Sequence, residues 1–446
     1  MINHSGSLAL TLCCLALAPS GSGKAKPERF ERLFVPTTVR AEINRSGYAG
    51  QQSWSLSRIG LEGVWAGPRR HLIDDMNLGQ LAFELRDAES DELLFSRGFS
   101  SLYGEWLSTA PALKGERRSG METLRFPLPR ESVVLCLLER GANGRFETRA
   151  RFPLDPQDYA LAPWPQSPEQ VDIIDVVISG PLDKRVDLLV VGDGYPDDQA
   201  EKFRRDLERL AATLSSEAPW SSAWHLFNLR GLREIGRTER GPAEPRKRVF
   251  PRSALTSFDT FASPRYLCPT DFRRLEDLAG RVPHDVLIVL VNTARYGGGG
   301  VFRQFTVSTA DGEFDAYLFL HEFGHGFAGL GDEYFTSDVA YENDASQVEP
   351  WEPNLTRHPS RALLKWGHFV STKTPLPTPD QAAYDGVVGA FEGGGYLAKG
   401  VFRPTRRCKM KNKGAVGYCP VCSAAIERMI AFTADLDRLP AIKEAK

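Results

Sequence analysis

The chain has 446 residues, of which 42% are hydrophobic and 10% are aromatic. This length exceeds what one hydrophobic core usually organises, so we expect two or three globular domains. The 55 Lys and Arg residues are nearly balanced by 57 Asp and Glu residues, which leaves a formal net charge of -2. Such a balance produces no overall field that attracts phosphate backbones or anionic membranes, and nucleic acid is therefore not an expected partner.

The N-terminus contains one apolar run, LALTLCCLALA, at residues 8–18. Roughly 11 residues suit the hydrophobic region of a signal peptide and fall short of the ~20 that span a bilayer as a helix. Although no Lys or Arg precedes the run, we predict a signal peptide over residues 1–23, a secreted or periplasmic protein, and no transmembrane segment in the mature chain. Lipid anchoring at Cys13 is disfavoured, because Leu12 stands where a small residue normally precedes a lipidated cysteine.

Residues 24–160 have the texture of a β-rich domain. Short segments in which apolar and polar residues alternate are separated by Gly, Asp and Asn clusters; the clearest are 38–43, 80–87, 92–99, 132–139 and 145–152. This pattern predicts an all-β, sandwich-like N-terminal domain. The proline-rich stretch that follows predicts a linker over residues 161–180.

Beyond the linker, long apolar runs alternate with helical patterns. RVDLLVVGDGY at 185–195 and DVLIVLVNT at 285–293 are typical of strands buried on both faces. Between them, residues 197–216 are charged and carry apolar side chains at helical spacing. Strand, helix and strand in this order predict an α/β domain, which we place over residues 181–435 with a C-terminal tail at 436–446.

The segment LFLHEFGHGFAGLGDEY at 318–334 carries the clearest chemical signal. On a helix, His321 and His325 project from one face, one turn apart, and two such imidazoles bind a single Zn²⁺. Glu322 lies on an adjacent part of the same surface, where it reaches the water on the metal and accepts its proton as a general base. The alternative is a helix that carries two histidines by chance.

The residues after the second histidine favour the metal site. Gly329 and Gly331 are poor helix formers that end the helix and turn the chain sharply. This turn brings Asp332 or Glu333 back towards the metal as a third ligand, and the fourth position is left for water.

The glycine run at 297–300 is a weaker signal. A phosphate-binding loop would require a helix directly after it, but residues 301–309 have the pattern of a strand. The run therefore predicts either a flexible rim of the substrate cleft or a plain hairpin.

The motif resembles that of the IgA peptidase family of zinc metallopeptidases, which is related to the metzincins and carries HEFGHxFxGLxDEY. The chain matches it at His321, Glu322, His325, Gly329, Leu330, Asp332, Glu333 and Tyr334. Further resembling segments lie at 186–195, 227–231, 291–300, 349–356, 391–396 and 402–422, and the N-terminal region resembles the family's β-rich domain. The resemblance implies a zincin-type, metzincin-like α/β catalytic domain after an all-β domain.

The resemblance also implies roles for individual residues. The two histidines would bind one catalytic zinc ion and the glutamate beside them would be the general base. In metzincins the third ligand lies six residues after the second histidine, where this chain has Gly331, which has no side chain to coordinate with. Asp332 is therefore our first choice as the third ligand and Glu333 the alternate.

Other motif residues and three cysteines lie in supporting positions. Metzincins place a methionine under the zinc, and Met410 is the natural candidate; Tyr334 completes the motif. Cys408, Cys419 and Cys422 cluster around that methionine and suggest either a second metal site or a disulfide. Because three thiols without a nearby histidine make a poor closed zinc site, we favour a disulfide between Cys408 and one of the other two.

These features predict a secreted, zinc-dependent endopeptidase that acts on protein or peptide substrates through a zinc-bound water activated by the glutamate. The alternatives are an extracellular zinc-binding protein of the same fold with a binding or adhesion role, and a zinc-dependent amidase that acts on a non-protein substrate. The residues contain no readable signal for bound calcium.

Overall fold

The computed structural model describes residues 29–166, 168–335, 348–414 and 416–436. The predicted signal peptide at 1–23 and the predicted tail beyond residue 436 lie outside the described residues. Within the described ranges, every helix is too short or too polar to cross a membrane.

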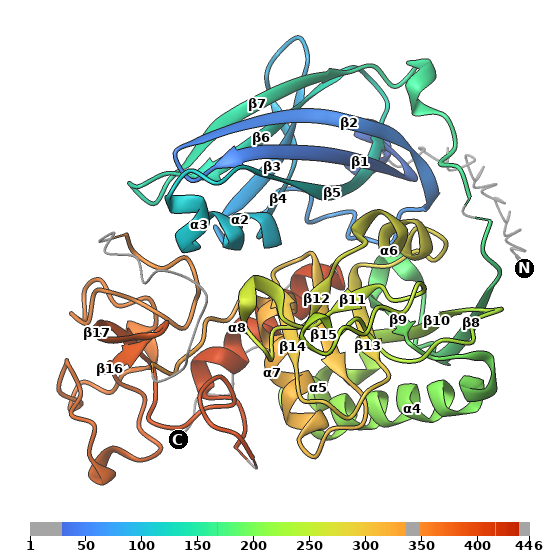
Figure 1. Cartoon of the computed structure of the whole chain (residues 1–446). Helices are drawn as coiled ribbons and strands as arrows, with labels where there is room; N and C mark the ends of the chain where they lie inside the picture. Colours follow the sequence, from blue (N-terminus) through green and yellow to red (C-terminus); the bar gives the residue numbers. More distant parts are fainter. Residues whose placement is uncertain (1–28, 167, 336–347, 415, 437–446) are drawn as a thin grey trace, which may run out of the picture.

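The N-terminal part consists of two antiparallel sheets, which form the upper layer in Figure 1. The first sheet has the order β2-β1-β5 and contains β1 (Phe34–Tyr48), β2 (Gln51–Val64) and β5 (Arg118–Pro129). The second has the order β4-β3-β6-β7 and contains β3 (Leu81–Asp87), β4 (Leu93–Phe99), β6 (Val133–Arg140) and β7 (Phe146–Leu154). Facing side chains from both sheets, such as Phe83 and Phe126, share one core. The β-rich N-terminus predicted from the sequence is confirmed.

Three short helices accompany these sheets: α1 (Arg29–Leu33), α2 (Leu102–Leu107) and α3 (Ala110–Leu113). The hydroxyl of Ser101 accepts a hydrogen bond from the backbone N–H of Gly104 and so caps α2. This helix lies on the side of the N-terminal sheets that faces the rest of the chain (Figure 1).

The second part is built on a six-stranded mixed sheet with the order β14-β15-β13-β9-β10-β8. Its strands are β8 (Val171–Val177), β9 (Val186–Asp193), β10 (Phe227–Glu234), β13 (Val286–Val291), β14 (Gly298–Val301) and β15 (Phe305–Thr309). The four inner strands are parallel, and both edge strands are antiparallel to their neighbours. Every residue of β9 is buried, because the sheet is covered on both faces. The edge strand β8 falls inside the segment that the sequence predicts as a linker.

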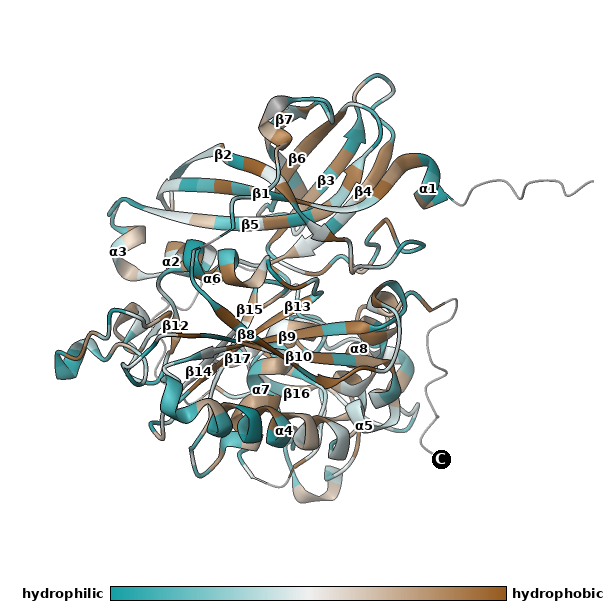
Figure 2. Cartoon of the chain, turned by 90° about the vertical axis from the view of Figure 1, so that its right-hand side faces the viewer, coloured by the Kyte–Doolittle hydropathy of each residue, from teal (hydrophilic) through white to brown (hydrophobic). Residues whose placement is uncertain are grey.

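Helices cover the two faces of this sheet. On one face lie α4 (Ala200–Ser216), α5 (Trp220–Ala223), α7 (Asp315–Ala328) and α8 (Pro420–Thr433), which share a core with alternate residues of β9 and β13. On the other face lies α6 (Phe272–Ala279), which shares a second core with the intervening residues. Figure 2 shows α4 and α5 below the sheet and the N-terminal layer above it.

Two small hairpin-like pairs complete the described elements. β11 (Thr256–Ser257) pairs with β12 (Cys268–Pro269), and β16 (Phe391–Gly394) pairs with β17 (Leu397–Arg403). The β16–β17 hairpin belongs to the long segment between α7 and α8, and this segment returns to the end of α7 at the site described below.

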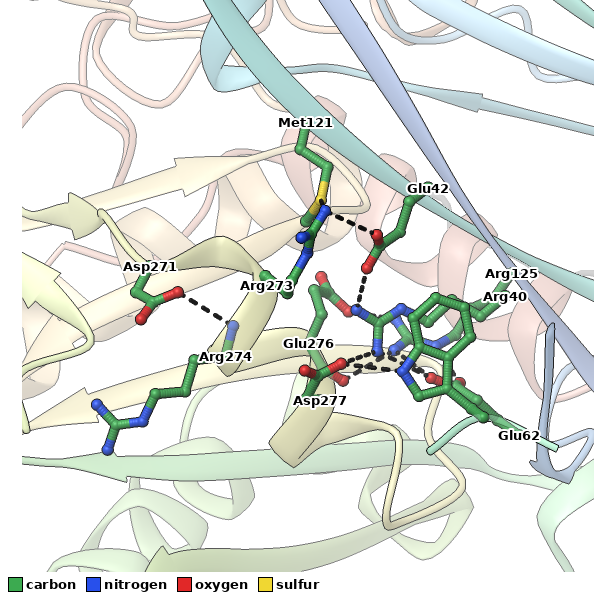
Figure 3. Close-up of polar contacts among 11 residues, drawn as sticks. Arg40, Glu42, Glu62, Met121, Arg125, Asp271, Arg273, Arg274, Glu276 and Asp277 are labelled. Atoms are coloured by element: carbon green, nitrogen blue, oxygen red, sulfur yellow. Dashed lines mark hydrogen bonds and ion pairs between the residues drawn. The ribbon is translucent and has the colours of Figure 1, made fainter. Parts of the chain in front are cut away.

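Largely buried ion pairs join the N-terminal layer to α6 (Figure 3). Arg125 of β5 contacts Glu62 of β2 at 2.7 Å and Glu276 of α6 at 2.6 Å. Arg40 of β1 contacts Asp277 of α6 at 2.8 Å. These contacts link the two parts, and removing one partner would leave a largely buried charge without compensation.

Candidate metal centre and active site

The site is built on α7 and on the turn that ends it. Gly329 has a φ of +64°, a left-handed conformation that suits glycine, and its N–H donates to the carbonyl of His325 at 3.0 Å. The N–H of Leu330 donates to the carbonyl of Gly324 at 3.2 Å, which completes the cap. The chain therefore reverses one helical turn after the second histidine and carries Asp332 back towards α7, as the glycines of the sequence predict.

Three ligand atoms converge at this point. The Nε2 atoms of His321 and His325 lie 3.2 Å apart, and Oδ1 of Asp332 lies 3.1 and 3.2 Å from them. The other ring nitrogens face backbone carbonyls: Nδ1 of His321 lies 3.2 Å from the carbonyl of Lys409, and Nδ1 of His325 lies 2.5 Å from that of Leu330. These carbonyls accept hydrogen bonds from the Nδ1–H groups and so direct the lone pairs of both Nε2 atoms to the same point.

The three residues fit a divalent metal ion. Ligands at about 2.0–2.2 Å from a tetrahedral zinc ion are separated by roughly 3.3 Å, which agrees with the observed spacings. Oδ1 of Asp332 is buried and has no well-oriented hydrogen-bond donor among the described residues. Two imidazoles and one carboxylate are a donor set that zinc accepts in catalytic sites, with one position left open.

The electrostatics of this group favour a cation. Burial alone would raise the pKa of Asp332, but the adjacent His325 and His321 hold it well below its usual range. Burial alone would lower the pKa of His325, yet the carboxylate of Asp332 raises it to about 9. The site therefore stabilises positive charge at the point where the three ligand atoms meet.

Glu322 lies on the cleft side of α7, against the edge strand β14. A Cβ atom on Gly300 would lie 2.3 Å from the carbonyl oxygen of Glu322, and a Cβ atom on Gly298 would lie 2.8 Å from its Cγ. Only glycine therefore permits this close approach of strand and helix. The glycine run forms a hairpin strand, and Gly298 and Gly300 also line the cleft; the flexibility expected of a cleft rim stays a prediction.

Burial raises the pKa of Glu322, an effect that the neighbouring imidazoles of His321 and His325 partly oppose. A carboxylate with a raised pKa is a stronger base than one in water, and this is the property that proton transfer near neutral pH requires.

Met410 is fully buried against α7. A Cβ atom on Gly324, between the two histidines, would lie 2.9 Å from the Sδ atom of Met410. The carbonyl of Met410 also accepts a hydrogen bond of 2.9 Å from the N–H of Glu333. The loop that carries the methionine therefore supports both the histidine helix and the turn that carries Asp332.

Glu333 is not part of the histidine group. Its Oε1 atom lies 3.2 Å from Sγ of Cys422, in a buried cluster with Cys408 and Cys419. All cysteines among the described residues carry free thiols, and the Sγ atoms of Cys408 and Cys422 lie 3.7 Å apart.

The sequence interpretation missed two residues that position the candidate ligands. The hydroxyl of Tyr396 donates a hydrogen bond to Oδ2 of Asp332, and the side chain of Asn354 bonds both the N–H and the carbonyl of Gly331. Both lie in segments that resemble the family, FEGGGY and EPWEPNLT, which is the signal that could have identified them. Tyr334 stacks on His321 with ring centroids 6.2 Å apart.

The site opens into a cleft of about 610 Å³ that lies between the two parts of the chain. Residues of the N-terminal layer, including Gln80, Ser100 and Glu105, line one wall, and Arg265, Tyr296 and Tyr317 line others. The hydroxyl of Tyr266 bonds the carboxylate of Glu105 across this boundary. The N-terminal layer therefore contributes directly to the surface that a substrate meets.

Comparisons with known proteins found two family models that match this chain. A family model described as IgA Peptidase M64 matches residues 174–384 and 380–430, and a model described as Peptidase M64 N-terminus matches residues 29–151. No curated protein matches the chain. The first match includes α7, the turn after it, the methionine loop and most of α8.

Proposed function

We propose that this chain, which belongs to the IgA Peptidase M64 family and is therefore a metallopeptidase, is a zinc-dependent endopeptidase with a zincin-type catalytic domain. The observation that carries the proposal is the convergence of His321, His325 and Asp332 on one point, with Glu322 beside it in an open cleft. The substrate of a peptidase is a protein or peptide, and the volume of the cleft is within the range of ligand sites.

In this proposal, three residues bind the metal ion and a fourth transfers a proton. His321, His325 and Asp332 would hold the ion, and their contacts with backbone carbonyls and Tyr396 keep them in place. When bound, zinc acts as a Lewis acid that acidifies a water molecule and polarises the scissile carbonyl. The carboxylate of Glu322 would accept a proton from the attacking water and return it to the leaving amine.

The choice of Asp332 over Glu333 as the third ligand is part of this proposal. It is supported by the 3.1 and 3.2 Å distances from Oδ1 of Asp332 to the two imidazoles, and by the position of Glu333 in the cysteine cluster.

We also propose that the protein is exported through the apolar run at residues 8–18. N-terminal sequencing of native material should find a mature chain that begins after residue 18. Recovery of an intact Met1 in a cytosolic fraction would contradict export and would leave the peptidase assignment untouched.

A cleavage screen tests the proposed activity. Unrelated proteins are incubated with the purified chain and analysed by mass spectrometry, with the Glu322→Gln variant as the matched control. New internal peptide termini that appear only with the parent are expected. Their absence, together with turnover of non-peptide amides, would favour the amidase alternative.

A further inference from the structure

A second buried cluster of metal-binding side chains lies beside the Asp332–Glu333 turn. Cys408, Cys419, Cys422 and Glu333 are each at most 4% exposed, and one ligand atom from each lies within 4.8 Å of the others. They come from three separate segments: the turn after α7, the methionine loop and the start of α8. Four potential ligands from distant parts of the chain are thus collected in one place that water does not reach.

The spacing of these atoms suits a shared metal ion. The Sγ atoms of Cys408 and Cys422 lie 3.7 Å apart, and sulfurs at about 2.3 Å from a tetrahedral zinc ion are separated by roughly 3.8 Å. A disulfide would require a separation of about 2.0 Å. It would also use only two of the three sulfurs and would leave a thiol and a carboxyl group buried together.

Backbone N–H groups face two of the three sulfurs. Sγ of Cys408 faces the backbone N–H of Cys419 at 3.3 Å, and Sγ of Cys419 faces the N–H of Cys422 at 3.5 Å. Cys419 is also the N-cap of α8, a helix of 14 residues, where the helix dipole stabilises negative charge. These contacts stabilise the deprotonated form that binds metals.

Glu333 supplies a fourth ligand with an open acceptor. Its Oε1 atom accepts a hydrogen bond of 3.1 Å from the side-chain amide of Asn354. Its Oε2 atom is buried and has no hydrogen-bond partner in the part of the chain that the structure describes. An unpaired buried carboxylate oxygen is costly, and a metal ion would satisfy it.

We propose that Cys408, Cys419, Cys422 and Glu333 bind a second, structural zinc ion in a closed site, in place of the disulfide predicted from the sequence. Thiolate-rich tetrahedral sites select zinc among the common divalent ions, and four protein ligands leave no position for water or substrate. On binding, the ligand thiols release their protons to solvent as the sulfur–zinc bonds form.

This ion would brace the catalytic centre without taking part in the reaction. Cys408 begins the loop whose next two carbonyls bond the ring of His321 and the N–H of Glu333. Glu333 itself follows Asp332 in the chain. A metal ion that links the loop, the turn and the start of α8 would therefore keep His321 and Asp332 in their positions relative to each other.

Metal analysis of single variants tests the proposal. The full-length chain is purified without added metal, and its zinc is measured by mass spectrometry. Two zinc ions per chain are expected in the parent. His325→Ala and Cys422→Ser should each retain one zinc ion. The matched control Cys136→Ser, in the N-terminal layer, should retain two zinc ions. A parent with a single ion that is lost in His325→Ala would overturn the second site and leave the proposed peptidase centre standing.

A second measurement covers the case in which Cys422→Ser does not fold. His325→Ala, which keeps all three cysteines, is loaded with Co²⁺. Absorption from thiolate-to-cobalt charge transfer should persist, and a mercurial thiol reagent should release the ion. Absence of that absorption, or a disulfide-linked peptide from these cysteines in an unreduced digest, would refute the proposal.

Discussion

Removal of one hydroxyl group at Tyr396 should weaken the catalytic metal site measurably. The hydroxyl donates a hydrogen bond to Oδ2 of Asp332, a carboxylate held ionised by the two histidines. A hydrogen bond to a charged group contributes about 1.5–3 kcal/mol, and each 1.4 kcal/mol corresponds to a factor of about ten in affinity. Tyr396→Phe should therefore weaken zinc binding about 10- to 100-fold, the scale known for hydrogen-bond partners of metal ligands.

Competition with a chelator in zinc-buffered solution measures this affinity. Tyr317→Phe is the matched control, because Tyr317 stacks on His321 with ring centroids 5.6 Å apart but is not hydrogen-bonded to Asp332 in the structure. We expect the control to bind zinc as the parent does. Equal zinc affinity in Tyr396→Phe and the parent would show that this hydroxyl does not position the ligand, and the reasoning would be refuted.

Three further predictions concern the third ligand, the domain interface and pH. Asp332→Ala should lose one metal ion per chain while the thiolate-to-cobalt absorption is unchanged; metal content equal to that of the parent would contradict the ligand assignment. Arg125→Met should lower the free energy of unfolding in urea by about 3 kcal/mol, because it leaves buried Glu62 and Glu276 without their partner; an unchanged value would show that the ion pairs do not hold the interface. Burial and Arg125 lower the pKa of His284 to about 4. Between about pH 6.5 and pH 4 the unfolded chain therefore binds a proton at His284 that the folded chain does not bind. Stability should fall as the pH decreases from about 6.5 to about 4, by at most about 3 kcal/mol and less where solvent screens the ring, and the His284→Gln variant should show a flatter dependence.

Strands with strong local patterns were predictable from the sequence, and strands without them were not. β9 is a continuous apolar run because it is buried on both faces, and the prediction over 185–195 contains it. β2 alternates serines with Trp54 and Leu56, but its apolar side chains are only partly buried, and it is not among the strands predicted from the sequence. β8 is a short edge strand, and only its pairing with β10 reveals it.

The candidate metal site shows the same division between local and distant information. The spacing of His321 and His325 within one helix is local, and the sequence predicts it. The choice between Asp332 and Glu333 is not local, because adjacent side chains in the turn point in different directions, and contacts from Asn354 and Cys422 fix which side each faces. Tyr396 lies 64 residues from Asp332, and no spacing rule connects them.

The Glu322→Gln variant tests the central claim most directly, because this change keeps the shape of the side chain and removes its basicity. Zinc content and thermal unfolding should stay near those of the parent, since Glu322 is not a ligand in the proposed site. Peptide cleavage should fall by roughly 10²-fold or more, the scale expected for loss of a general base. Cleavage at the parental rate would show that α7 serves only to bind metal or support the fold, and would contradict the proposed mechanism.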